Sequence, residues 1–452
     1  MIQLSLSEVA SATKGQLIGD DADFSGVSID TRTLVQNNLY VAIKGESVDG
    51  HEYISQAIKA GASAVMVEHQ VDVSVPQIIV EDTTKALGAL AKYWRQQFTI
   101  PFIGLTGSCG KTSTKQMLAA ICQQVGNTLY STGNQNNQFG VPLTLFRLDE
   151  NVEYAVIEMG TDRPGEIAYL TDIVEPQVAL ITNIAAVHIA KTGRFDSVDK
   201  IFTEKSNIFS HLPNNGCAIL NADDAYYPQW CERLSQVNRI SFGLQSKADV
   251  SATDLSHNAD LQYSFSLQTP VGSTDVHLST IGKHNVENAL AASAACIAIG
   301  LSLDDITTGL ANIELVDRRL IRYHAVNDAS VIDDSYNANV KSVPAVIEML
   351  AQYPGKRIMV LGDMGEVGPT SQAEHARMGQ LAKDLGIDSF YAYGEETQYS
   401  ISAFGDNGFH FDSHEALSEQ LIKQLNPHTT VLVKGSNGMM MYKIVEAIRI
   451  QD

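Results

Sequence analysis

The sequence predicts an α/β protein of three domains, with a parallel sheet in the central domain and a Rossmann-like sheet in the C-terminal one. A chain of 452 residues suits about three domains, and its content of 44% hydrophobic and 18% charged residues is typical of globular proteins. Three apolar runs, residues 102–105, 154–157 and 178–181, lack polar alternation and so favour buried parallel strands. We expect the domains at residues 1–98, 99–314 and 315–452.

The two outer domains are expected to alternate short strands and helices, and the N-terminal α/β domain is the smaller one. Its expected strands are 27–30, 39–43, 64–67 and 77–80, and its expected helices are 51–60 and 83–98. The C-terminal domain has expected strands at 331–333, 358–361, 390–392 and 430–433. Residues 289–301 predict a buried helix, because this small-residue stretch is too short to span a bilayer.

A glycine-rich loop follows the first apolar run and precedes a helical pattern; its residues are Gly107, Ser108, Cys109, Gly110, Lys111 and Thr112. This order predicts a phosphate-binding loop in a mononucleotide-binding sheet, since backbone N–H groups and the helix N-terminus attract phosphate oxygens. Lys111 can then reach the outer phosphates, and the Thr112 hydroxyl can approach magnesium. The commoner consensus requires glycine at Leu105, so the loop is of a minority type. A glycine turn beside a surface lysine is the alternative.

Polar residues also follow the other two apolar runs. Glu158 comes after the second, and Thr182 and Asn183 come after the third, with His188 slightly beyond. Ligands gather at the carboxyl ends of parallel strands, so one sheet edge should carry phosphate-binding and metal-binding groups. Glu158 is a suitable oxygen ligand for magnesium, although a solvated carboxylate is the alternative. His188 taken alone favours a structural role.

Composition excludes several classes of protein. A net charge of −21 argues against a nucleic-acid partner, which requires a basic face. The N-terminus lacks a basic start followed by an apolar block, so no secretory signal and no membrane partner are expected. The five cysteines are odd in number and form no C-x-x-C pair, which favours reduced thiols in the cytoplasm over disulfides or zinc. We expect Cys109 to have no catalytic role.

Further motifs extend along the chain: IEMG at 157–160, NIAAVHI at 183–189, NADD at 221–224, GKHNVENALAA at 282–292, DDSYNAN at 333–339, LGDMGEVG at 361–368 and LVKGSNG at 432–438. Together with GSCGKT they resemble, in order and spacing, the Mur ligases, the ATP-dependent amide ligases that build the peptide stem of bacterial cell-wall precursors. Residues 29–45 and 49–54 resemble the uridine-nucleotide domain of the later members. Residues 131–148 are similar to the segment of the member that adds D-alanyl-D-alanine.

This resemblance implies that UDP-N-acetylmuramoyl-tripeptide and D-alanyl-D-alanine are the substrates, with ATP and two Mg²⁺ ions as cofactors. Lys111 and the loop amides would hold the β- and γ-phosphates, and Thr112 and Glu158 would hold one Mg²⁺. His188 and a carbamylated Lys205 would hold the other. A carbamate supplies the oxygen ligands that magnesium prefers, although an exposed lysine is the alternative and Lys200 is a weaker candidate for this position.

The resemblance also implies contacts to the nucleotide and to the incoming amine. Asn285 and Asn288 would contact adenine, and Asn285 could at the same time cap the helix. Arg319 would contact the γ-phosphate. Arg318 is the alternative, because the family often has glycine before the arginine and this chain has Arg318 at that position. The remaining implied contacts are Asp334 to the ribose and phosphate region, Asn337 to the amine, and Lys434 and Ser436 to substrate.

The uridine nucleotide and the sugar-peptide would be held mostly by polar residues of the N-terminal domain. The implied uridine diphosphate contacts are Asp30, Thr31, Arg32, Lys44, Gly45, Asp49 and His51, with Asn134 and Asn137 near the sugar-peptide. Arg32 and Lys44 suit a pyrophosphate, and solvated surface charge is their alternative.

The implied reaction passes through an acyl phosphate, which must be kept from water, so the C-terminal domain is expected to close over the central one. We expect a monomeric enzyme. The alternatives are another Mur-type or folylpolyglutamate-type amide ligase, or a non-catalytic nucleotide-binding module. About a hundred residues precede the phosphate loop, and this argues against the folate enzymes.

Overall fold

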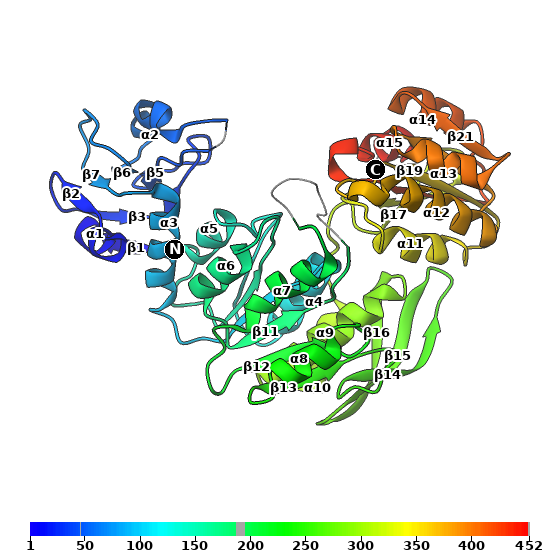
Figure 1. The fold of residues 1–452 in the computed structure, drawn as a ribbon, viewed down its shortest axis with the longest axis horizontal. Helices are drawn as coiled ribbons and strands as arrows, with labels where there is room; N and C mark the ends of the chain where they lie inside the picture. The colour runs from blue at the N-terminus through cyan, green and yellow to red at the C-terminus, as the bar shows by residue number, and fades with distance from the viewer. Residues whose placement is uncertain (46, 187–194, 451–452) are drawn as a thin grey trace.

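The computed structural model describes residues 1–45, 47–186 and 195–450. Figure 1 shows three α/β regions that follow one another along the chain, with the middle region between the two others. Each region has its own sheet of mainly parallel strands. The predicted fold class is therefore confirmed. The predicted boundaries at 98/99 and 314/315 remain predictions.

The first region contains a five-stranded sheet in the order β2-β7-β6-β5-β4, in which β2 alone runs antiparallel to its neighbour. A separate pair, β1 (Gln3–Ser5) and β3 (Asp23–Ser25), lies beside it. The sheet strands are β2 (Gln16–Ile18), β4 (Val27–Ser28), β5 (Leu39–Val41), β6 (Ala64–Val67) and β7 (Gln77–Ile79). The helices are α1 (Leu6–Thr13), η1 (Gly50–Tyr53), α2 (Ile54–Lys59) and α3 (Thr83–Arg95). The expected strands 27–30, 39–43, 64–67 and 77–80 all form, the first as only two residues.

Helix α3 joins the first region to the middle one. It ends at Arg95 and not at the predicted Phe98, because the next N–H groups, those of Gln97 and Phe98, bond to carbonyls three residues back. The buried Arg95 guanidinium donates to the carbonyl oxygens of Phe98, Val174 and Glu175. Its apolar residues share one core cluster with the middle sheet. The first two regions are thus packed together through a common apolar core.

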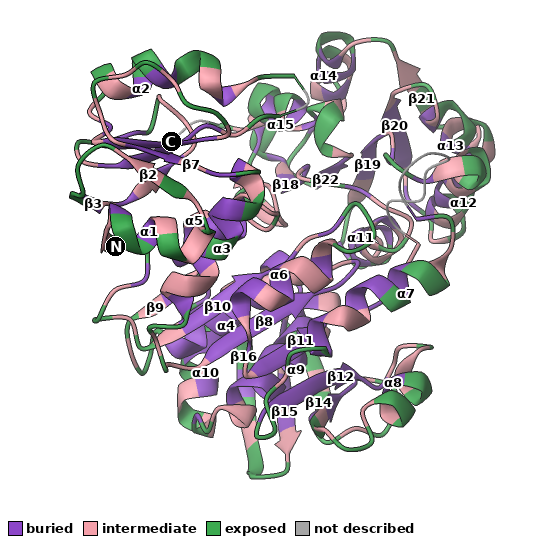
Figure 2. Ribbon diagram, turned by 60° about the vertical axis from the view of Figure 1, so that its left-hand side comes forward, coloured by how far each residue is buried: buried purple, intermediate pink, exposed green. Residues whose placement is uncertain are grey.

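The middle region is built on six parallel strands in the order β13-β12-β11-β8-β10-β9. Figure 2 shows its central strands as buried. The strands are β8 (Phe102–Thr106), β9 (Thr128–Tyr130), β10 (Tyr154–Glu158), β11 (Val178–Ile181), β12 (Cys217–Asn221) and β13 (Asn238–Phe242). The helices are α4 (Lys111–Cys122), α5 (Gly140–Leu145), α6 (Glu166–Val174), α7 (Val198–Ser206), η2 (Asn207–Phe209), α8 (Tyr227–Arg233), α9 (His284–Ala298) and α10 (Leu303–Ala311). The three predicted buried strands are confirmed, side by side and parallel.

An antiparallel sheet that the sequence reading did not anticipate extends from the middle region towards the last one. Its strands are β14 (Ser251–His257), β15 (Gln262–Thr269) and β16 (Gly272–Ile281). Alternating burial of Tyr263, Phe265 and Leu267 places one face of β15 in the core of the middle region. That period of two is a strand signal that the sequence contains.

The last region has a six-stranded sheet in the order β17-β18-β22-β19-β20-β21, parallel except for the edge strand β17. The strands are β17 (Ile321–His324), β18 (Ser330–Asp334), β19 (Lys356–Gly362), β20 (Ser389–Tyr393), β21 (Gly408–Phe411) and β22 (Thr429–Lys434). The helices are η3 (Val326–Asp328), α11 (Ser342–Leu350), η4 (Gly368–Thr370), α12 (Ser371–Asp384), α13 (Thr397–Phe404), α14 (His414–Ile422), η5 (Asn437–Met439) and α15 (Tyr442–Ile448). All four predicted strands of this region form, each slightly longer than expected.

Candidate active site

The phosphate loop runs from the end of β8 to the start of α4, and its two glycines are required by geometry. Gly107 has φ +153°, and a Cβ there would lie 1.9 Å from Thr182 Oγ1. Gly110 has φ +81°, and a Cβ there would lie 2.4 Å from Asn288 Oδ1. These approaches bring the loop against β11 and α9, so any side chain at either position would force the loop apart.

Two of the loop amides are bonded inside the protein. The Ser108 N–H donates to the Asn183 carbonyl at 2.9 Å, and the Cys109 N–H donates to Asn183 Oδ1 at 3.0 Å. Phosphate oxygens would therefore be bound by the amides from Gly110 onward, where α4 begins and its first N–H groups lack intrahelical acceptors. Ser108 and Cys109 shape the loop through Asn183 instead of offering their own amides.

Lys111 and Thr112 lie at the opening of α4 and line a cavity of about 620 Å³ between the middle and last regions. The Lys111 ammonium donates to the Gly107 carbonyl at 2.8 Å, so it lies over the loop. An Arg319 guanidinium N–H donates to Thr112 Oγ1 at 3.2 Å. Arg318 instead lines a different cavity and pairs with Asp317, so of the two arginines Arg319 faces the phosphate loop.

Glu158 ends β10 and is only 2% exposed on the wall of the same cavity. Its Oε1 accepts a hydrogen bond from Asn136 at 2.9 Å, and its own N–H donates to Ser131 Oγ at 3.0 Å. Its Oε2 is buried and has no hydrogen-bond partner among the described residues. A buried carboxylate oxygen in this state is costly unless a cation compensates it. Asn134 and Asn137 of this segment were predicted from the sequence as site residues, whereas Asn136, the residue that orients Glu158, was not.

Lys205 is buried on α7, with 1% of its surface exposed. Burial and then the neighbouring Lys111 charge lower the pKa of Lys205 to about 7. The preceding residue, Glu204, accepts the N–H groups of Gly165 and Ile167 at the start of α6, which fixes this turn of α7. The alternative lysine, Lys200, is exposed and pairs with Asp196. The other predicted ligand of this position, His188, lies outside the described residues.

A second buried lysine was not selected from the sequence. Lys115 lies one helical turn after Lys111 on α4, is 3% exposed, and has its ammonium 5.8 Å from the centre of the Tyr130 ring. Burial lowers the pKa of Lys115, while the charge of Glu158 acts to raise it. Its i, i+4 spacing from Lys111, which places the two lysines on one face of α4, is the sequence pattern that could have identified it.

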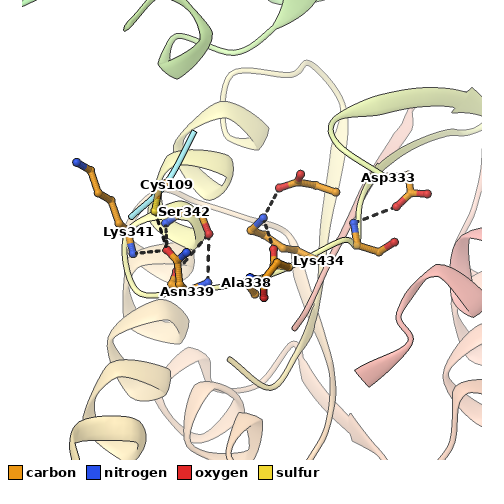
Figure 3. A network of polar contacts seen from close by, with 10 residues as sticks. Cys109, Asp333, Ala338, Asn339, Lys341, Ser342 and Lys434 are labelled. Carbon is orange, nitrogen blue, oxygen red and sulfur yellow. Dashed lines mark hydrogen bonds and ion pairs between the residues drawn. The ribbon is translucent and has the colours of Figure 1, made fainter. Parts of the chain in front are cut away.

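The last region contributes a polar network to the opposite wall of the cavity (Figure 3). The buried Lys434 ammonium pairs with Asp334 and also donates to the Asn337 carbonyl at 2.8 Å. Lys434 therefore positions Asp334 and the Asn337 turn, and its predicted contact with substrate remains a prediction. Ser436 Oγ donates to the Asp363 carbonyl at 2.6 Å, and both Asn337 and Ser436 line the cavity.

A smaller cavity of about 230 Å³ adjoins the loop on the side of α9. Asn285 donates to the Ile281 carbonyl, and Asn288 donates to Asn285 Oδ1 at 2.9 Å. The helix-capping reading of Asn285 is wrong, because its side chain lies inside the first turn and α9 has no side-chain cap. His284 lines this cavity and was missed; burial lowers its pKa to about 4, with Asp334 opposing and Lys434 reinforcing that shift.

The residues predicted around the uridine nucleotide and the sugar-peptide divide into two groups. Lys44, Gly45, Asn134 and Asn137 line a third cavity of about 480 Å³ where the first and middle regions meet. Asp30 holds Arg32 in a bidentate pair and accepts its backbone N–H, and these hydrogen bonds lower the pKa of Asp30. Thr31 lies within that turn.

His51 has both ring nitrogens occupied within the first region. Its Nδ1 bonds to Asp49 at 2.7 Å, and its Nε2 accepts from the Glu68 N–H at 3.0 Å. These two bonds assign the Nδ1-protonated tautomer. Asp49 and His51 therefore shape the loop that follows β5, and neither His51 nitrogen is left to bind a diphosphate.

Family comparisons agree with this arrangement of a phosphate loop facing a second Rossmann-like sheet. Residues 105–296 match the Mur ligase middle domain, residues 318–437 match the Mur ligase glutamate ligase domain, and residues 23–95 match the Mur ligase family catalytic domain. The chain belongs to the Mur ligase family.

Individual members of that family are similar to this chain over nearly its whole length. The chain is 42% identical over 452 residues to the UDP-N-acetylmuramoyl-tripeptide–D-alanyl-D-alanine ligase of Escherichia coli (strain K12), with 99% of each chain covered. A crystal structure of MurF from Acinetobacter baumannii matches with a TM-score of 0.93 at 33% identity, over 99% of this chain and 98% of that one. MurF from Thermotoga maritima, solved in complex with ADP, matches with a TM-score of 0.83 at 25% identity, over 94% and 96%.

Proposed function

We propose that this Mur ligase joins D-alanyl-D-alanine to UDP-N-acetylmuramoyl-tripeptide at the expense of ATP, forming the pentapeptide precursor of peptidoglycan. The observation that carries the proposal is the shared cavity: Lys111 and Glu158 of the middle region face Arg319 and Asn337 across it. Two anionic reactants, a triphosphate and a carboxylate, need such a convergence of cations and metal ligands. The family and the relatives described above supply the substrate class.

In this proposal the nucleotide spans the two cavities that meet at Cys109 and Gly110. Adenine would lie in the smaller one beside Asn285 and Asn288. The phosphates would lie on the amides from Gly110 onward, with Lys111 and Arg319 against the outermost phosphate. Asp334, held by Lys434, would face the ribose and phosphates.

Magnesium fits the donor set around Glu158. Its unpartnered Oε2 and the nearby Thr112 hydroxyl are hard oxygen donors, which Mg²⁺ prefers. His188 and a carbamylated Lys205 would hold the second ion, since the lowered pKa of Lys205 keeps a larger share of the amine neutral, as carbamate formation requires. When bound, the two ions would neutralise charge on the phosphates and the substrate carboxylate.

The chemistry has two steps. The terminal carboxylate of the tripeptide attacks the γ-phosphorus of ATP, giving an acyl phosphate and releasing ADP. The amine of D-alanyl-D-alanine then attacks the acyl carbon, expels inorganic phosphate and loses a proton. An α-amine has a pKa of about 8, so a useful fraction is already neutral and a strong base is not required. Asn337, on the cavity wall of the last region, would orient this amine.

The uridine nucleotide and sugar would occupy the third cavity, where Lys44 offers a cation to the diphosphate and Asn134 and Asn137 face the sugar-peptide. No helix among the described residues is long and apolar enough to cross a membrane. We further propose that the protein acts in the cytoplasm, where its five unpaired cysteines stay reduced, and as a monomer, since one chain supplies every proposed contact.

The test is a coupled assay of ADP and phosphate release with purified protein, Mg²⁺ and UDP-sugar tripeptides carrying either diaminopimelate or lysine. D-alanyl-D-alanine is expected to give one ADP per amide formed. L-alanyl-L-alanine and D-alanine alone are the matched donors and should give little turnover. Equal ADP release with every donor, or with none, would contradict the proposal and favour a different amide ligase or a non-catalytic nucleotide-binding module.

A further inference from the structure

The middle and last regions meet at a second place, away from the phosphate loop. The turn Asn258–Leu261, which connects β14 to β15, reaches the last region beside α11 (Figure 1). We call this turn the joint. It belongs to the antiparallel sheet of the middle region, yet its contacts lie in the core and on the surface of the last region.

Leu261 is the apolar part of the joint. Its side chain is 2% exposed and belongs to the same buried cluster as Ile347, Leu350 and Tyr353 of the last region. The neighbouring Asp260 accepts from the Arg322 guanidinium, and its carbonyl accepts from the Tyr353 hydroxyl at 3.1 Å. A middle-region turn is thus inserted into the core of the last region and fixed there by polar contacts on both sides.

The turn is held in a conformation that does not favour leucine. Asn258 Oδ1 accepts the N–H groups of Asp260 and Gln262 at 3.0 and 3.1 Å, which closes the turn. Leu261 has φ +59°, in the left-handed region where glycine or asparagine costs less. A leucine at this position indicates that its side chain is needed for packing across the two regions.

The joint is also connected to the nucleotide cavity. The Leu261 carbonyl accepts from the Gly282 N–H at 2.9 Å, and the adjacent Ile281 both lines the smaller cavity and packs in the same cluster as Leu261. Helix α9, which carries Asn285, begins two residues after Gly282. On the other side of the joint, α11 supplies Ser342 to the same cavity. The joint and the cavity therefore share one stretch of backbone.

Near the phosphate loop the middle and last regions are connected by contacts of a different kind. The Cys109 thiol donates to Asn339 Oδ1 at 3.3 Å, and Arg319 donates to Thr112. These are polar contacts beside a cavity large enough to admit water, which can replace them at little cost. The apolar contact of Leu261 has no such substitute, since separating it exposes buried hydrocarbon to water.

We propose that Leu261 and Asp260 are positioning residues for the ligase reaction: the joint is the pivot that keeps the last region in register over the phosphate loop. The contacts of the joint persist while the polar contacts near the phosphate loop break and reform. The joint thereby sets the positions of three side chains relative to the bound nucleotide: Arg319, Asp334 and Asn337. This inference rests on the proposed function for its catalytic consequence, and on the contacts of the joint for its geometry.

The test compares Leu261→Ala with Leu267→Ala. Leu267 is fully buried on β15, the strand that follows the joint, but packs in the middle-region core, so its truncation removes the same atoms without touching the joint. We expect Leu261→Ala to lower kcat by about 10- to 100-fold, because a shift of about 1 Å in the catalytic groups has that effect. Phosphate released per amide formed should rise above one, since a displaced last region admits water to the acyl phosphate. The KM for UDP-sugar tripeptide should hardly change.

Leu267→Ala should keep one phosphate per amide even where it loses stability, which separates positioning from general destabilisation. Leu261→Met, which conserves volume, should restore most of kcat, and Tyr353→Phe, which removes only the hydroxyl contact to Asp260, should lower kcat a few-fold. If Leu261→Ala does not fold, these two variants carry the test. Unchanged kcat and unchanged phosphate per amide in Leu261→Ala, or equal losses in both alanine variants, would overturn the proposal.

Small-angle scattering with ADP provides a readout that does not depend on turnover. Leu261→Ala should give a larger radius of gyration than the wild-type protein, and Leu267→Ala should match the wild type. If the wild type forms no amide, the proposed function fails on its own, and the scattering comparison still decides the pivot. Identical scattering curves for all three proteins would count against it.

Discussion

Charged side chains of the middle and first regions differ sharply in burial. In the middle region Glu158 and Lys205 are 2% and 1% exposed, whereas in the first region the Arg32 side chain is 84% exposed beside Asp30. Burying a charge costs several kcal/mol unless a partner or an ion compensates it, while an exposed ion pair contributes about 1 kcal/mol or less. A buried charge of this cost is expected where it serves chemistry, and the exposed pair should tolerate substitution. The predictions below test this contrast.

The largest effect is expected for Glu158→Gln, which removes a charge but keeps the shape. Without a carboxylate, magnesium binding at Glu158 should fail and kcat should fall by about 10³-fold or more, corresponding to several kcal/mol of lost charge stabilisation. The measurement is steady-state ADP release at saturating substrates. Glu150→Gln, an exposed carboxylate in a loop of the same region, is the control and should be neutral. A Glu158→Gln enzyme with more than a tenth of wild-type kcat would contradict the assignment.

Lys205→Arg should lower kcat by about 10²-fold or more, because arginine stays protonated and cannot form a carbamate. In the wild type, the pKa of about 7 predicts that carbamylation declines as pH falls below 7, since the amine becomes protonated. Carbon-13 NMR in labelled bicarbonate measures the carbamate directly. Lys200→Arg, on the exposed face of α7, is the matched control. A carbamate signal that survives in Lys205→Arg would place the modification elsewhere.

Arg319→Ala and Arg318→Ala form a natural pair of neighbours. Arg319 reaches Thr112 on the phosphate loop, so its loss should lower kcat by about 10²-fold, the typical cost of removing one preorganised cationic donor. Arg318 faces Asp317 in a separate cavity, and its loss should change kcat by less than about threefold. Single-turnover phosphate release distinguishes the two. The reverse order of effects would exchange their roles.

His284 predicts a pH dependence of stability. Its folded pKa of about 4 lies below the ordinary histidine value of 6.5, so between those values the unfolded state binds more protons and stability falls as pH drops from 6.5 towards 4. The shift limits this loss to about 3 kcal/mol. Urea unfolding at several pH values should show a flatter profile for His284→Gln than for the wild type. His324→Gln, an exposed histidine on β17, should keep the wild-type slope; parallel slopes in all three would refute the assignment.

The smallest effect is expected for Arg32→Ala. Its guanidinium is solvated and engaged with Asp30, so the KM for UDP-sugar tripeptide should rise by no more than about fivefold, with kcat unchanged. Lys44→Ala, which alters a residue lining the third cavity, should raise that KM further. A larger rise for Arg32→Ala than for Lys44→Ala would show that the exposed pair binds the diphosphate after all.

Much of the fold was predictable from the sequence because its buried strands are recognisable as local apolar runs. The apolar runs at 102–105, 154–157 and 178–181 became β8, β10 and β11, since a strand buried on both faces needs a continuous apolar sequence. Partly exposed elements were missed or misjudged. Sheet β14–β16 was not predicted although Tyr263, Phe265 and Leu267 alternate, and α3 ends three residues before the predicted Phe98 because its last turn changes to i−3 bonding.

By itself, the sequence determined the phosphate loop, the carboxylate at the end of β10 and the resemblance that names the family, because each depends on neighbours in the chain. Only the tertiary structure decided that Arg319 and not Arg318 faces Thr112, that Lys434 holds Asp334, and that Asn136 orients Glu158. Those choices depend on which side chains meet across regions far apart in sequence. Which side chains become partners is decided by burial and hydrogen bonding where the regions contact one another, and not by residue type alone.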